Sequence, residues 1–167
     1  KFHDIPNTVS KSIESFKGYP IKLLTIHLSG GSSMIKSALV SSKSIDAKCI
    51  GVSILTSINE EESQEIYNQE IPKTVSSMFN LANETDIDGV VCSPHELKLA
   101  GNLLQDKIKI TPGIRLSDSN SDDQSRVMNP IEAIDLGATY LVIGRPITSH
   151  KDKASAFEKI YQSIYEE

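Results

Sequence analysis

The chain lacks the features that mark several broad classes of protein. Among its 167 residues, no apolar run approaches the roughly 18 to 20 residues that a membrane-spanning helix needs. Residues 1–10 contain no apolar stretch of the kind found in a signal peptide. The net charge of -5 argues against a nucleic-acid partner, because nucleic-acid-binding proteins usually carry a basic stripe. We therefore expect a soluble protein that binds neither membranes nor nucleic acids.

Cysteine is also scarce, and no metal-binding spacing is present. Cys49 and Cys92 are far apart and each lies within an apolar run, which favours two buried, reduced thiols and a cytoplasmic protein. The alternatives, a disulfide or a metal pair, fit this spacing poorly. His3, His95 and His150 have no partner at metal-ligand spacing. The spacing therefore predicts no metal site.

Short β-rich runs alternate with longer helical patterns along the whole chain, which is typical of parallel βα units. The length suits one domain, or part of one, over residues 1–167. Phe2 would be the last residue of a strand whose body is not in the sequence. Complete strands are expected at Ile21–His27, Lys48–Thr56, Gly89–Ser93, Ile108–Thr111 and Tyr140–Gly144.

Capping signals mark the helices between these strands. Asn7 or Thr8 can cap a first helix that ends at Gly18. Ser93-Pro94-His95-Glu96 and Asn129-Pro130-Ile131-Glu132 both predict helix starts, and Gly137 closes the second of these helices. The segment 117–125 predicts a long surface loop. The other helices are expected at about Ser33–Ser42, Pro72–Asn83 and Asp152–Tyr165, with a shorter one near Glu60–Asn68.

This pattern predicts an α/β fold that supplies the last five to six βα units of a TIM (β/α)8 barrel, and an open doubly wound sheet is the alternative. The barrel is favoured because polar residues fall at the carboxyl ends of the strands, where barrel enzymes place their active sites. These residues are Asp4, His27, Thr56, Ser93, Arg115 and Arg145.

Two arginines occupy matched positions after neighbouring strands. Arg145 follows Gly144 at the end of one strand, and Arg115 follows Gly113 at the end of the preceding one. A glycine lets backbone amides approach an anion that a guanidinium then binds. Either arginine alone is more often a surface charge, but the pair favours a phosphate site.

Lys1 and Asp4 could be catalytic, or an exposed terminus and a turn residue. Pro6 holds Ile5 out of the helical region, so the segment 2–5 should stay extended and place both charges above the barrel mouth. On spacing alone the two interpretations are balanced. For His27, a packed, hydrogen-bonded side chain is favoured over a general base.

Seven ordered motifs, covering nearly the whole chain, resemble orotidine 5'-phosphate decarboxylase of the bacterial type. They are Lys1-Phe2-His3-Asp4-Ile5-Pro6-Asn7-Thr8, His27-Leu28-Ser29-Gly30-Gly31, Leu55-Thr56-Ser57, Asp88-Gly89-Val90-Val91-Cys92-Ser93, Thr111-Pro112-Gly113-Ile114-Arg115, Asp123-Gln124-Ser125-Arg126 and Ile143-Gly144-Arg145-Pro146. The resemblance implies conversion of orotidine monophosphate to uridine monophosphate in pyrimidine biosynthesis, without metal or organic cofactor.

The resemblance also implies residue roles. Lys1 would protonate C6 of the pyrimidine, and Asp4 would reach into the neighbouring subunit's site in a homodimer. Thr8 would contact the ligand near that boundary, and Thr56 would contact the pyrimidine. The phosphate would be held by Arg115, Gln124, Gly144 and Arg145.

The chain departs from the family pattern at its start. Two strands and the first aspartate of the family's Asp-x-Lys-x-x-Asp motif are not in the sequence, so we expect the chain alone to be inactive and unstable as an open barrel. One alternative is the related sugar-phosphate branch, hexulose-phosphate synthase and keto-gulonate-phosphate decarboxylase, which uses magnesium. Another is a non-catalytic nucleotide-binding fragment.

Overall fold

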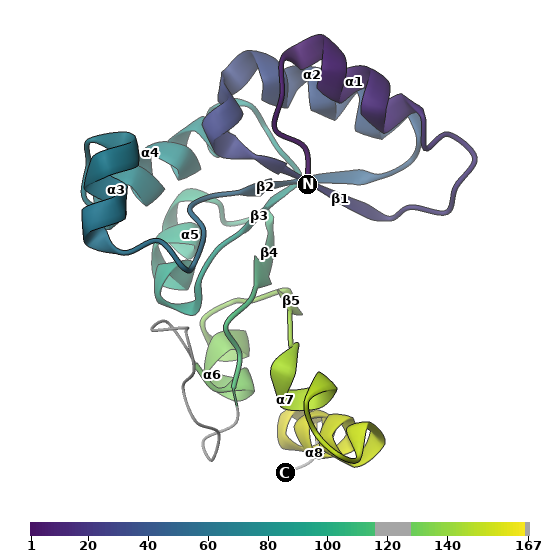
Figure 1. The fold of residues 1–167 in the computed structure, drawn as a ribbon, viewed down its shortest axis with the longest axis vertical. Helices are drawn as coiled ribbons and strands as arrows, with labels where there is room; N and C mark the ends of the chain where they lie inside the picture. Colours follow the sequence, from purple (N-terminus) through teal and green to yellow (C-terminus); the bar gives the residue numbers. More distant parts are fainter. Residues whose placement is uncertain (116–127, 166–167) are drawn as a thin grey trace.

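The computed structural model describes residues 1–115 and 128–165, which build a parallel sheet with helices packed against it (Figure 1). The strands pair in chain order, each parallel to its neighbours. A doubly wound sheet would instead reverse its strand order at a switch point, so the chain-ordered sheet supports the barrel over that alternative. The strands are β1 (Leu23–His27), β2 (Lys48–Val52), β3 (Gly89–Val91), β4 (Ile108–Thr111) and β5 (Tyr140–Leu141).

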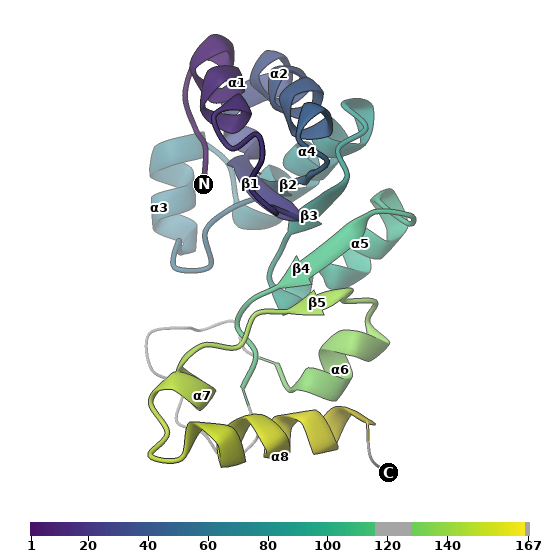
Figure 2. The ribbon, with the colours of Figure 1, turned by 90° about the vertical axis from the view of Figure 1, so that its right-hand side faces the viewer.

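Helices follow the strands and cover the sheet. Helices α1 and α2 lie side by side next to β1, whereas α6 and α8 lie beyond β5 (Figure 2). No helix of the described ranges is long and apolar enough to cross a membrane. The helices are α1 (Pro6–Glu14), α2 (Gly31–Ser44), α3 (Glu60–Tyr67), α4 (Ile71–Glu84), α5 (Leu97–Leu103), α6 (Pro130–Asp135), α7 (Arg145–Thr148) and α8 (Lys153–Tyr165), with 3-10 turns η1 (Leu28–Gly30) and η2 (Pro94–Glu96).

Several strands are shorter than the sequence predicts. Only β4 has the predicted bounds, and Thr56, Ser93 and Gly144 lie beyond the strands in which they were placed. Hydrogen bonding continues briefly past the regular pairing, as in the bond from the Val142 N–H to the Thr111 carbonyl at 2.9 Å. The strands end where the backbones diverge toward their loops.

The first helix begins earlier than predicted. Neither Asn7 nor Thr8 caps α1; Ile5 is the N-cap residue and Pro6 the first helical residue. The fixed backbone angle of proline suits the first helical position, where its missing N–H leaves no bond unmade. The Asp4 carboxylate accepts the Ile5 N–H at 2.7 Å, so it assists the turn into the helix.

Other predicted helix starts are confirmed. Asn129 accepts the Glu132 N–H at 2.9 Å at the start of α6. Glu96 accepts the Ser93 N–H at 2.9 Å, although the chain first makes the η2 turn and then enters α5. Gly137 adopts φ 94°, the left-handed conformation expected after a helix.

An open apolar groove lies along the β5 side of the molecule. It has a volume of about 400 Å³ and is lined by side chains of α6, β5, α7 and α8. Tyr140 is 51% exposed and Val142 is 50% exposed beside it. Along α8, the ring centroids of Phe157 and Tyr161 lie 6.2 Å apart and those of Tyr161 and Tyr165 lie 4.7 Å apart. This face is therefore unusually apolar for a surface.

Gly89 provides a test of how tightly β3 packs against β4. A Cβ at this position would lie 2.4 Å from the backbone oxygen of Ile108, which cannot move aside without breaking the sheet. We expect Gly89→Ala to lower the free energy of unfolding by roughly 1–3 kcal/mol, measured by urea denaturation. The matched control is Gly101→Ala in α5, where a Cβ would meet no atom within 4 Å. A helical glycine replaced by alanine should gain up to about 1 kcal/mol, so equal behaviour of the two variants would contradict this packing.

Candidate active site

The predicted site residues lie on loops at one end of the sheet. His27 ends β1, Thr56 lies in the turn after β2, Arg115 follows β4, and Gly144 and Arg145 follow β5. Because all the strands are parallel, their carboxyl ends meet at the same edge, where barrel proteins place their active sites.

The extended segment that carries Lys1 and Asp4 is fixed to the outer edge of β1. The Phe2 N–H donates to the Thr25 carbonyl at 2.9 Å, and the His27 N–H donates to the Phe2 carbonyl at 3.0 Å. This bridge confirms Phe2 as a strand residue. Ile5 has φ -59° and ψ 151°, so it stays out of the helical region before Pro6 as predicted, although the chain bends at Asp4.

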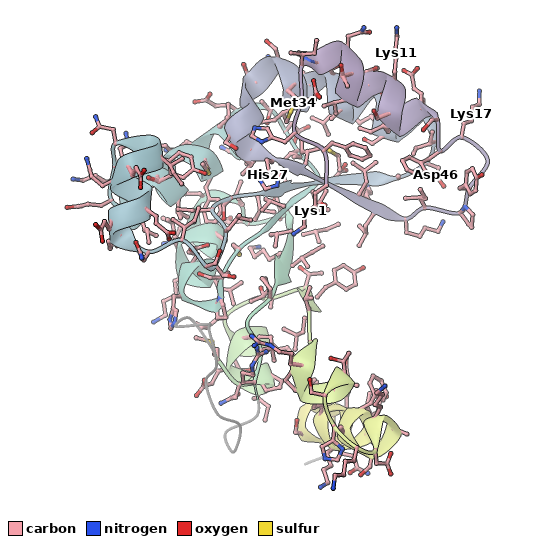
Figure 3. The ribbon with its side chains drawn as sticks, in the orientation of Figure 1. Lys1, Lys11, Lys17, His27, Met34 and Asp46 are labelled. Carbon is pink, nitrogen blue, oxygen red and sulfur yellow. The ribbon has the colours of Figure 1, made fainter. Side chains whose placement is uncertain are left out.

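Alternation along this segment decides where Lys1 points. The Phe2 ring packs edge-on against Phe16, with ring centroids 6.3 Å apart. Since neighbouring side chains of an extended chain point to opposite faces, Lys1 and His3 project from the other face, with His27. Figure 3 shows Lys1 and His27 near the start of the chain, beside β1. Lys1 thus lies on the sheet face away from Phe16.

Asp4 and Thr8 are exposed, the first just before α1 and the second on its first turn. The Thr8 backbone carbonyl accepts a hydrogen bond from the Ser12 hydroxyl at 2.8 Å, and the Thr8 side chain lies at the surface. Both side chains are therefore placed where a second molecule could reach them.

The two arginines follow adjacent strands at equivalent sequence positions. Thr111 of β4 pairs with Leu141 of β5, and each arginine stands four positions after one member of that pair, Arg115 after Thr111 and Arg145 after Leu141. The Arg115 N–H donates to the Met128 carbonyl at 3.0 Å, which fixes this backbone. The Arg115 guanidinium donates to the Ile114 carbonyl at 2.9 Å. Both arginines therefore lie in the chain just past the carboxyl ends of neighbouring strands.

The backbone before Arg145 is open to a ligand, whereas Gly113, before Arg115, is buried. Gly113 adopts φ 80°, a conformation that side chains disfavour. Gly144 is the N-cap residue of α7, and a Cβ there would meet no atom within 4 Å. These features fit the phosphate site that the sequence predicts. Gln124, predicted to complete it, lies outside the described residues.

The structure does not bring all the predicted residues together. Lys1 lies at the β1 edge of the described sheet, and the two arginines follow β4 and β5, the last two strands toward the opposite edge. Thr56 lies between them in the strand order. Within residues 1–115 and 128–165, no three His, Cys, Asp or Glu side chains form a group that could hold a metal ion.

The sequence analysis missed one neighbour of Lys1. His3 was considered only as a metal ligand, but its ring packs against His27 with centroids 5.2 Å apart and planes 30° apart. Burial, then His3, then the positive charges of Lys1 lower the pKa of His27 below its ordinary value. The half-buried His27 ring thus packs against His3, which bears out the packing part of its predicted role. The two-residue spacing of Lys1 and His3 in an extended segment was the signal for this arrangement.

Both cysteines are free and buried, as the sequence predicts. Burial is the main cause that raises the pKa of each thiol to about 12. Because the thiolate is the reactive form, we expect iodoacetamide at pH 8 to leave Cys49 and Cys92 unmodified in the folded chain. Both should react once the chain is unfolded in guanidinium chloride, as mass spectrometry can measure. Modification of either cysteine at the rate of a free thiol without denaturant would contradict their burial.

The chain-ordered parallel sheet, with polar side chains gathered at the carboxyl ends of its strands, places the molecule in the class of (β/α) barrel proteins. A family model described as "Orotidine 5'-phosphate decarboxylase / HUMPS family" matches residues 1–160. The chain belongs to this family.

Individual relatives agree with the family match. The chain is 41% identical to an orotidine 5'-phosphate decarboxylase of Staphylococcus saprophyticus, over 98% of this chain and 73% of the relative. It is 44% identical to the protein of that name from Ehrlichia chaffeensis, over 98% of this chain and 72% of the relative. The crystal structure of the Lactobacillus acidophilus protein of that name superposes with a TM-score of 0.83 at 32% identity, covering 99% of this chain and 73% of that one. The family's fold is a TIM barrel, of which this chain supplies a part.

Proposed function

We propose that the protein carrying this chain decarboxylates orotidine 5'-phosphate to uridine 5'-phosphate, in pyrimidine biosynthesis and in the cytoplasm, without metal or organic cofactor. The observation that carries the proposal is that Arg115 and Arg145 follow neighbouring strands at the same sequence distance from a paired position, in a chain whose relatives bear this name. A dianionic phosphate is the ligand that two converging guanidinium groups suit best.

Lys1 is the proposed proton donor. The bond between C6 and the carboxylate breaks, its electron pair stays on C6, and the Lys1 ammonium donates a proton to that carbon as carbon dioxide leaves. The carbanion that remains at C6 has no adjacent carbonyl to take up its charge. A fixed cation aimed at C6 therefore stabilises the charge as it develops. The two hydrogen bonds of Phe2 support this role, because they fix the backbone next to Lys1.

The other residues bind the nucleotide. Arg115, Gln124, Gly144 and Arg145 hold the phosphate, and Thr56 contacts the pyrimidine. Binding energy from a phosphate remote from C6 then helps to organise the reacting end. The exposed Asp4 and Thr8 serve the site of a second subunit in a homodimer, which their surface positions allow.

The test compares the chain alone with a completed barrel. We define the completed barrel as this chain with the part of the Staphylococcus saprophyticus relative that precedes its match to Lys1 joined ahead of that residue. Loss of orotidine 5'-phosphate absorbance should be rapid with the completed barrel, unaffected by a chelator, and absent with the chain alone. Activity abolished by the chelator would favour the magnesium-dependent sugar-phosphate branch. Binding of uridine 5'-phosphate by the completed barrel without turnover would favour a nucleotide-binding module.

A further inference from the structure

The segment that carries Lys1 and Asp4 has a narrow attachment to the rest of the molecule. Its backbone is tied to β1 by the two hydrogen bonds of Phe2, one to Thr25 and one from His27. Beyond Asp4 the chain turns away into α1. The position of Lys1 therefore depends on what holds residues 1–4 against this edge of the sheet.

Two imidazole rings supply the side-chain part of that attachment. His3 lies over His27, and its Nε2 is 3.4 Å from the Ser29 hydroxyl oxygen. Gly30 makes room for this arrangement, because a Cβ there would lie 3.3 Å from His3 Cδ2 and 2.2 Å from the Met34 sulfur. In Figure 3, His27 lies beside the start of the chain, with Met34 above it and Lys1 below it. The ring of His3 thus fits a place that the fold keeps free.

We infer that His3 and His27 form a pH-sensitive clasp that holds residues 1–4 on the edge of β1, with His27 acting as a positioning residue for Lys1. The clasp is closed while His27 is uncharged, and protonation of His27 opens it. Its value for catalysis rests on the proposed role of Lys1, whereas the clasp itself can be tested without any substrate.

The charges around His27 determine the direction of the effect. The groups that act on its charge are the His3 ring, the Lys1 side chain and the Lys1 α-amino group, and each of them opposes a further positive charge. Burial of the ring acts in the same direction and is the largest cause of the lowered pKa. A proton on His27 would therefore place a partly desolvated cation among groups that repel it.

The direction in which pH changes the stability of the clasp follows from the linkage between protonation and structure. The pKa of His27 is lower in the clasped state than its ordinary value of 6.5, so the released state binds the proton more readily. The clasp is fully formed above pH 6.5, weakens as the pH falls below it, and stops weakening below the pKa of the clasped state. Activity that depends on Lys1 would decline over the same interval.

Hydrogen exchange of the His27 amide, followed by NMR, tests the clasp in the chain as it stands. This amide bonds to the Phe2 carbonyl and so reports release of the segment. We expect its protection factor, normalised to amides of β2, to fall several-fold between pH 7.5 and pH 5.5. In His27→Gln the normalised value should not change with pH, whereas His95→Gln on η2 should behave as the unaltered chain does.

A second variant keeps the test decisive if His27→Gln does not fold. His3→Phe retains a ring against His27 but removes a group that opposes its protonation, so the midpoint of the His27 ring titration should rise. A normalised protection factor that does not change with pH in the unaltered chain would overturn the clasp, as would an unchanged His27 midpoint in His3→Phe. Neither result would touch the proposed decarboxylation, which is measured separately on the completed barrel.

Discussion

Lys1→Ala in the completed barrel is expected to lower the turnover of orotidine 5'-phosphate by at least about 1,000-fold, because a proton donor and a stabilising cation are lost together. The affinity for uridine 5'-phosphate should change far less, since the product has no charge developing at C6. Steady-state absorbance assays and calorimetric titration with uridine 5'-phosphate measure the two effects.

Lys11→Ala is the matched control for this variant. Lys11 lies on the exposed face of α1, where its side chain points away from the sheet (Figure 3). Removing it takes away the same charge at a distance from the proposed site, so turnover should stay near that of the unaltered protein. Turnover in Lys1→Ala within tenfold of the Lys11→Ala value would refute the role proposed for Lys1.

Arg145→Ala is expected to weaken binding of uridine 5'-phosphate by about 10- to 100-fold, as the loss of one or more charge-assisted hydrogen bonds implies. Arg115→Ala should have a similar effect, because Arg115 follows the neighbouring strand at the equivalent sequence position and is proposed to bind the same phosphate. The affinity for uridine, which lacks the phosphate, should not change. Calorimetric titration with each ligand distinguishes the loss of phosphate binding from general damage to the site.

Lys151→Ala is the control for the arginines. Lys151 is exposed shortly after α7, so its removal changes the net charge by the same amount near the same loop. Binding of both ligands should be unaffected. Equal loss of uridine and uridine 5'-phosphate affinity in Arg145→Ala would show that the arginine supports the loop and does not hold the phosphate.

Local signals in the sequence predicted those elements whose ends are set by the chain itself. β4 was predicted with its observed bounds. Asn129 is the N-cap residue of α6, as the capping pattern indicates. The end of β5 was wrong by three residues, because a strand that pairs on one side stops where that neighbour diverges. The start of α1 was wrong because proline conformation prevailed over two residues that make good caps.

For the candidate site as well, features set by local sequence signals were predicted and features set by contacts between segments were not. The residues at strand ends were placed at the correct edge, because parallel strands share their direction. The packing of His3 on His27 was missed, since it joins residues from two separate segments and needs the register of Phe2 on β1. Sequence spacing within one segment cannot supply that register.

Pairing of the strands in chain order has a consequence for how the molecule is made. Each strand from β2 onward finds its partner in the strand synthesised just before it, so every step closes a loop of moderate length. During translation, a βα unit can dock as soon as it leaves the ribosome, without waiting for distant segments. Growth of the sheet is therefore directional, and the unit with β5 and α8 docks onto a surface that the earlier units have already folded.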